Sequence, residues 1–226
     1  MKVFWDSVKK YRVLWIFSIG MLLLAIISMG ERGNRQYLTY NESLDKVVAT
    51  VQGEEITLLD FAIYVAHQEM EIHKQAVVYN PENTKEYWGI HTNGQFVSIA
   101  ARDAAIQMAI HDELFYQLSE EIVIKFSEEE LQVLQNDVDD FWYDLTDDGK
   151  EERLGITKQD VYDAMYKIAM AEKSQYYYAM MDGRSYEDYS FASEDYLEFL
   201  RDYEYSIEED VLERIQFGYV TLVHDN

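Results

Sequence analysis

The chain has 226 residues, of which 48% are hydrophobic and 15% aromatic, and its formal charge at pH 7 is −24. This hydrophobic share is large enough for a folded core, which excludes a disordered acidic tail. A surface this negative repels phosphate backbones, so no nucleic-acid partner is expected. The chain contains no cysteine, which excludes a disulfide framework, a thiolate metal site and a cysteine nucleophile.

An apolar run without charge occupies residues 13–30 (VLWIFSIGMLLLAIISMG). As a helix it would be roughly 27 Å long, close to the ~30 Å hydrocarbon thickness of a bilayer. Four basic residues, at positions 2, 9, 10 and 12, precede it, and such a flank stays in the cytoplasm. We therefore expect residues 1–12 to be a cytoplasmic basic tail and residues 13–30 a single transmembrane anchor in a bacterial cell membrane. The main domain is then extracytoplasmic.

The same run has a second interpretation, a signal peptide. Its length exceeds the apolar core of ~7–15 residues that is usual in signal peptides, which favours a retained anchor. Ser28 and Gly30, however, are small residues with the spacing that a signal peptidase accepts. Both fates place the later residues outside the cytoplasm. Residues 31–46 are polar and show no clear period, so we expect a stalk there.

A mainly α-helical domain with a small β-hairpin is expected over residues 47–226. The hairpin is predicted at Val47–Thr57, where two β-rich runs flank Gln52 and Gly53, because glycine readily adopts the positive φ of a tight turn. Long helices are predicted by apolar residues at helical spacing and by Ser or Thr followed three positions on by an acidic residue, the capping-box pattern. Counted from their caps, these helices cover about 57–79, 96–121, 127–143 and 157–181.

The remaining segments are less regular. An acidic loop is expected over residues 144–155, and shorter helices are expected over 194–204 and 207–215, the second capped by Ser206. The strand-like sequence Phe217–Val223 is expected to form a C-terminal strand that pairs with the N-terminal hairpin and brings the two ends of the domain together.

No pattern typical of a catalytic or metal site is present. The five histidines are scattered at positions 67, 73, 91, 111 and 224, without an HExxH motif. Neither a glycine-rich phosphate loop nor a G-x-S-x-G nucleophile elbow occurs. We therefore expect no catalytic residue, no metal and no cofactor.

Aromatic side chains are the candidates for binding a polypeptide, because tyrosine and tryptophan combine a large contact area with a polar tip. The candidate residues are Phe61, Tyr64, Tyr87, Trp88, Phe115, Trp142, Tyr176, Tyr177 and Tyr178. The alternative is that these rings pack as the core and rim of a helical domain. Consecutive helical residues point about 100° apart, so at least one of the three adjacent tyrosines should be exposed.

The segment VVATVQGEEITLLDFAIYV (47–65) resembles the opening of the SurA N-terminal-like chaperone family, which includes SurA/PrsA-type foldases. That opening is a hairpin of the form V-N-G-x-x-I-T, followed by an acidic–aromatic pair and a helix. The matching residues are Val51, Gln52, Gly53, Ile56, Thr57, Asp60 and Phe61. Gln52 stands where the family usually has asparagine. The likeness extends weakly through the helices to about residue 181.

The resemblance implies a membrane-anchored chaperone whose helical cleft binds unfolded or newly exported polypeptides. Family members often carry a parvulin-type prolyl isomerase domain after the helical part. The residues after Met181 are too few for that domain and lack its Gly-Gly-Asp-Leu-Gly segment, so no isomerase residue is carried over. A divergent peptidyl-prolyl cis-trans isomerase and a dedicated assembly partner are the alternatives. The sequence contains no signal of the oligomeric state.

The basic flank generates a topology prediction. Protease added to intact protoplasts should digest the chain after residue 46, because that part is expected outside the membrane. Immunoblotting with an antibody against the main domain measures the digestion, and a cytoplasmic protein serves as the control for intact cells. A domain that survives protease in intact cells but not in lysed cells contradicts this topology.

Overall fold

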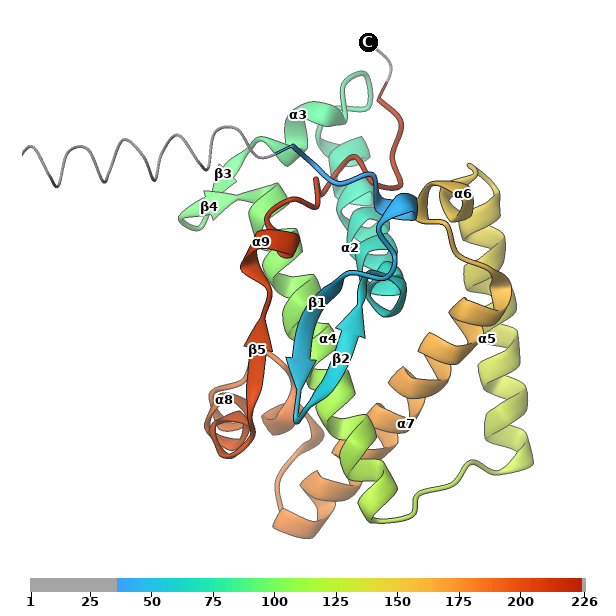
Figure 1. Ribbon diagram of the computed structural model, residues 1–226, viewed down its shortest axis with the longest axis vertical. Helices are drawn as coiled ribbons and strands as arrows, with labels where there is room; N and C mark the ends of the chain where they lie inside the picture. Colours follow the sequence, from blue (N-terminus) through green and yellow to red (C-terminus); the bar gives the residue numbers. More distant parts are fainter. Residues whose placement is uncertain (1–35, 225–226) are drawn as a thin grey trace, which may run out of the picture. The chain divides into compact units, whose positions relative to one another are not determined.

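The computed structural model describes residues 36–224 (Figure 1). The expected tail and anchor at 1–30 lie outside these residues. Within 36–224, no helix has the length and hydropathy needed to cross a membrane. The chain from Leu38 onward forms one unit, and it is mainly helical, as the sequence predicts. Its helices are α2 (Leu58–Tyr79), α3 (Lys85–Trp88), α4 (Val97–Glu121), α5 (Glu128–Thr146), α6 (Lys150–Leu154), α7 (Lys158–Asp182), α8 (Glu194–Phe199) and α9 (Glu209–Leu212).

The strands are short and lie in two small sheets. They are β1 (Val47–Val51), β2 (Glu54–Thr57), β3 (His91–Thr92), β4 (Gln95–Phe96) and β5 (Tyr205–Ile207). One sheet has the order β2-β1-β5 and the other pairs β3 with β4, all antiparallel. Short 3₁₀ turns are η1 (Tyr40–Glu42), η2 (Tyr186–Tyr189) and η3 (Leu200–Asp202).

The predicted hairpin is confirmed, and the backbone of its turn explains why glycine stands at position 53. Gln52 and Gly53 have φ values of 51° and 89°, which matches a two-residue turn with positive φ at both positions. The predicted capping box follows directly. The Thr57 amide donates to Asp60 Oδ2 at 2.9 Å, and the Asp60 amide donates to Thr57 Oγ1 at 3.4 Å, so α2 begins where β2 ends.

Two long helices, α4 and α7, pack against each other, with α2 on α4 and α5 on α7 (Figure 1). The predicted capping boxes of α5 and α7 are both present, at Ser127 and Thr157. Phe115 of α4 lies in an aromatic cluster, with its ring centroid 5.8–6.2 Å from those of Tyr189, Tyr196 and Phe199. This cluster joins the C-terminal segments to the helical core.

The predicted C-terminal strand at Phe217–Val223 is wrong. The strand that pairs with the hairpin is β5, which binds the free edge of β1, and Ser206 lies within it instead of capping a helix. The helix expected at 207–215 is reduced to α9. Gly218 explains the misprediction: its φ is +92°, and a Cβ there would lie 2.5 Å from the Trp88 ring.

The backbone of the same C-terminal segment binds the buried carboxylate of Glu69. Gly218 and Val220 donate their amides to Oε1 at 2.5 and 3.2 Å, and Thr221 donates its amide and hydroxyl to Oε2, both at 2.6 Å. Burial raises the pKa of Glu69, and these hydrogen bonds oppose part of that shift. Four donors on one buried acceptor hold the end of the chain against α2.

Two further predictions need correction. Residues 38–46, expected within the stalk, pack on the domain: Tyr40 is buried and donates its hydroxyl to the Leu58 carbonyl at 2.7 Å. The unit therefore begins at Leu38 and not at Val47. The expected acidic loop at 144–155 contains the short helix α6, whose Arg153 donates to the Thr221 carbonyl. Both segments are polar in sequence, and only long-range contacts order them.

Glu69→Gln should destabilise the protein by about 1–3 kcal/mol, because the amide group of glutamine would face backbone donors and leave them unsatisfied. The free energy of unfolding from urea melts measures the effect. Glu71→Gln is the matched control, since Glu71 is exposed on the same helix and pairs only with exposed Lys74. Equal stability of the two variants would show that Glu69 does not anchor the C-terminal segment.

Candidate functional site

The nine aromatic candidates do not form one surface. Phe61 and Phe115 expose none of their surface and Trp88 exposes 2%, so in this structure they belong to the core. Tyr64 is 8% exposed and lies at the wall of two hollows described below. Four of the nine rings, Tyr64 included, are thus buried in the core, and Tyr87, Trp142 and Tyr178 pack against it at the rim.

The remaining candidates lie in three places. Tyr87 is half-buried beside Tyr79 of α2, and Trp142 is half-buried on α5. In the tyrosine run, Tyr178 packs against Phe115 and Phe199 and Tyr177 is half-buried beside it. Tyr176 exposes 63% of its surface. One tyrosine of the run is thus available to a partner, as helical geometry requires.

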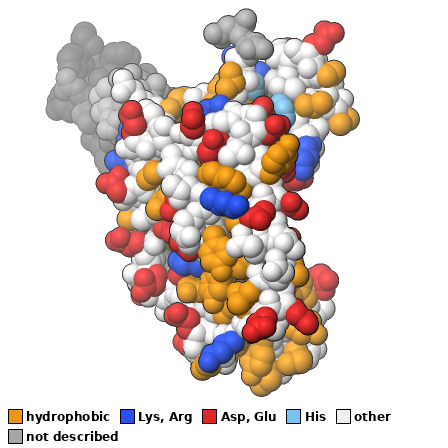
Figure 2. Space-filling model, turned by 90° about the vertical axis from the view of Figure 1, so that its right-hand side faces the viewer, with side chains coloured by type: hydrophobic (Ala, Val, Ile, Leu, Met, Phe, Trp, Pro, Cys, Tyr) orange, Lys and Arg blue, Asp and Glu red, His pale blue; other side chains and the backbone are white. Residues whose placement is uncertain are grey.

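An apolar groove of about 390 Å³ lies among four helices, α2, α4, α5 and α7. We define it by its lining: Ile63, Tyr64, His67, Met108, Asp112, Leu134, Asp137, Phe141, Met165, Ile168, Ala169 and Glu172. Apolar side chains form most of the lining, and most of these are only partly buried. On the side of the molecule that carries α5, hydrophobic side chains gather in the middle and lower part of the face, with acidic ones around them (Figure 2).

A chain of buried polar groups forms the wall of the groove. The Tyr64 hydroxyl donates to Asp112 Oδ2 at 3.1 Å, and Asp112 Oδ1 lies 2.7 Å from His111 Nδ1. The other ring nitrogen of His111, Nε2, lies 2.9 Å from the Tyr189 carbonyl. A carbonyl only accepts, so Nε2 is the donor in this contact. The chain joins α2, α4 and η2.

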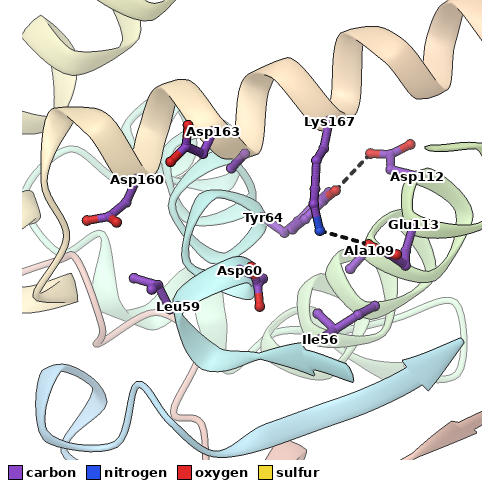
Figure 3. Close-up of a pocket in the computed structure, with 11 residues that line it drawn as sticks. Ile56, Leu59, Asp60, Tyr64, Ala109, Asp112, Glu113, Asp160, Asp163 and Lys167 are labelled. Atoms are coloured by element: carbon purple, nitrogen blue, oxygen red, sulfur yellow. Dashed lines mark hydrogen bonds and ion pairs between the residues drawn. The ribbon is translucent and has the colours of Figure 1, made fainter. Parts of the chain in front are cut away.

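A second, smaller hollow of about 140 Å³ lies beyond Tyr64 and Asp112, which line both. We call it the acidic pocket. It is lined by Ile56, Leu59, Asp60, Tyr64, Ala109, Asp112, Glu113, Asp160, Asp163, Ala164 and Lys167. Figure 3 shows its two polar contacts, Tyr64 with Asp112 and Lys167 with Glu113 at 3.3 Å. Asp60 and Asp160 are engaged in the capping boxes of α2 and α7.

Tyr64 and Lys167, which line the acidic pocket, both have raised pKa values. Burial and the Asp112 carboxylate raise the pKa of Tyr64 well above its usual value, so Tyr64 stays a neutral donor. Burial opposes the charge of Lys167, but the Glu113 carboxylate outweighs burial and raises the pKa, so the amine stays protonated and unreactive. Among residues 36–224, no cluster of three or more His, Asp or Glu side chains is arranged to hold a metal ion.

Glu172 and Asp137 place negative charge at the rim of the groove, from α7 and α5. Glu172 as a whole is exposed to solvent. Its pKa is nevertheless raised, and the largest cause is the partial burial of its carboxyl group. The Asp112 and Asp137 carboxylates raise it further, and His111 opposes them. The rim is therefore a place where negative charges repel one another beside apolar surface.

Most of the groove was not among the aromatic candidates. Its apolar lining comes from aliphatic and methionine side chains such as Met108, Met165 and Ile168, which ordinary helix amphipathicity predicts only as core. A usable signal was the run His111-Asp112-Glu113 between the apolar pairs Ala109-Ile110 and Leu114-Phe115, since charged groups are rarely buried without a specific partner.

The electrostatics of the rim generate a prediction. In Asp137→Asn, the pKa of Glu172 should fall towards that of an ordinary glutamate, because one negative neighbour is removed. Carboxyl ¹³C chemical shifts followed through a pH titration measure the change, with Asp140→Asn as the control, since exposed Asp140 does not line the groove. The raised pKa also means that ionisation of Glu172 at higher pH destabilises the folded state, and Asp137→Asn should relieve part of this penalty. An unchanged pKa of Glu172 in Asp137→Asn would show that the Asp137 carboxylate does not raise it.

Known proteins supply no relative for this chain: no family model, curated protein or solved structure matches it. The resemblance to SurA N-terminal-like chaperones is carried by the residues of the hairpin and the start of α2, as given above.

Proposed function

We propose that the chain is a membrane-anchored, extracytoplasmic chaperone that binds apolar segments of unfolded or newly exported polypeptides in the apolar groove, without a catalytic step. The observation that carries the proposal is the groove itself, an open hollow of about 390 Å³ lined mainly by partly buried apolar side chains from four helices. Apolar surface of this kind at a rim of charged residues is typical of an interaction site.

The character of the lining supports adaptable binding. Met108 and Met165 line the groove together with Phe141. Methionine is unbranched and polarizable, so it adjusts to side chains of different shape, and it is frequent at surfaces that bind many partners. A holdase must accept unrelated segments, and such a lining has that property. The formal charge of −24 helps to keep a complex with an apolar client soluble.

Tyr176 extends the groove along α7. It follows Glu172 by four residues, and residues four apart lie on the same face of a helix. Glu172 lines the groove, and Tyr176 exposes 63% of its surface. A client segment longer than the groove would reach this ring, which offers apolar contact area together with a polar tip.

Two substitutions test the proposal through suppression of client aggregation, measured by light scattering with several unrelated unfolded proteins. Ala169→Phe adds a ring inside the groove and should abolish most of the suppression, because the client's space is filled. Tyr176→Ser should weaken it by about threefold to tenfold, since a lost aromatic contact of about 1 kcal/mol corresponds to that range. Both variants should keep nearly the wild-type Tm.

Tyr143→Ser is the matched control, because Tyr143 is 69% exposed on α5 but does not line the groove. Equal suppression by the wild type and by Ala169→Phe, with the Tm preserved, would contradict client binding in the groove. Acceleration of a proline-limited refolding reaction, in place of suppression, would point to the isomerase alternative.

A further inference from the structure

We propose that the apolar groove selects polypeptide segments in which a lysine or arginine adjoins apolar side chains, and that Asp137 and Glu172 make this selection. The inference deepens the proposed function and rests on it, because a client must occupy the groove before its charge can be recognised. The proposed occupant is thus a polypeptide segment whose apolar side chains lie on the floor of the groove and whose lysine or arginine lies at its rim.

The two carboxylates come from different helices, Asp137 from α5 and Glu172 from α7, and both line the groove together with Asp112 of α4. Within residues 36–224, the side-chain carboxylates of Asp137 and Glu172 make no hydrogen bond and no ion pair. Asp112 differs from them, because its two oxygens are engaged by His111 and Tyr64. The charges of Asp137 and Glu172 are therefore the ones left for a ligand.

Nearby acidic side chains are neutralised by lysines, and these two are not. Glu113 is paired with Lys167 at 3.3 Å, Glu130 with Lys173 at 2.5 Å and Asp139 with Lys158 at 2.8 Å. No lysine or arginine is among the described residues that line the groove. His67 is the one basic side chain in the described lining, so we expect a lysine or arginine of the bound segment to pair with these carboxylates.

An uncharged apolar segment would cover the rim at a cost. It would displace water from two carboxylates without replacing the lost hydrogen bonds, and burial of an unpaired charge is unfavourable. Desolvation and carboxylate repulsion already raise the pKa of Glu172. A lysine or arginine removes this cost, since its aliphatic stem can lie on Phe141 and Met165 while its charged end reaches the carboxylates.

The test measures the dissociation constants of fluorescein-labelled peptides by anisotropy with the full chain. The peptides share one short apolar sequence and differ at the central position, which is lysine, glutamine or glutamate. The wild type should bind the lysine peptide about threefold to tenfold more tightly than the glutamine peptide, as expected for partly exposed ion pairs. The glutamate peptide should bind most weakly.

Asp137→Asn/Glu172→Gln should remove the preference for lysine, because the lysine peptide loses its ion pairs and the glutamine peptide no longer covers two unpaired charges. Asp140→Asn/Glu152→Gln is the matched control, because it removes the same amount of charge at exposed positions outside the groove. That control should keep the preference. Thermal melts verify that both double variants are folded, and Asp137→Asn alone should show a smaller loss of preference.

The outcomes separate the inference from the proposed function. In one outcome, the wild type binds the glutamine and lysine peptides equally well, and Ala169→Phe abolishes this binding. That result would overturn the inference and leave the groove as the client site. A lysine preference that persists in Asp137→Asn/Glu172→Gln would also overturn it, since the attraction would then come from the overall charge. Failure of all three peptides to bind would remove the proposed function and the inference together.

Discussion

The groove depends on one buried polar chain, Tyr64–Asp112–His111 and the carbonyl of Tyr189. Each member is buried, and each makes a hydrogen bond to the next. Unpaired, these groups would each cost free energy in the interior, but as a complete chain they fix how α2, α4 and η2 lie relative to one another. Because Tyr64 and Asp112 also line both hollows, the contact that orders the core also shapes the binding surface.

The same principle holds the end of the domain in place. Glu69, from the middle of α2, accepts hydrogen bonds from the backbone of the segment after Phe217, and β5 completes the sheet at the free edge of β1. The C-terminal part is therefore held to α2 and to β1 through polar contacts that are specific in geometry. A groove built on such a scaffold can keep apolar side chains partly exposed without collapsing on them.

Charge has two roles in the proposed chaperone. Spread over the surface, the excess of carboxylates favours solubility and disfavours contact with anionic polymers. Three acidic side chains of α4 and α5 are paired with lysines of α7. Asp137 and Glu172 have no such lysine partner. Because they lie beside the apolar surface of the groove, their negative charge acts on whatever binds there, whereas the charge of the rest of the surface acts mainly on solubility.

The sequence by itself determined the local structure: the positive-φ turn at Gln52-Gly53, the capping boxes and the apolar periods of α2, α4, α5 and α7 all follow from contacts within a few residues. Tertiary structure decided where β5 pairs, why the segment at Gly218 is not a strand, and which aromatic rings are buried, because those outcomes depend on partners up to 152 positions away, as between Glu69 and Thr221. It also decided the candidate site. Periodicity identifies which face of each helix is apolar, but only the packing of four helices shows where two such faces fail to meet and leave a groove.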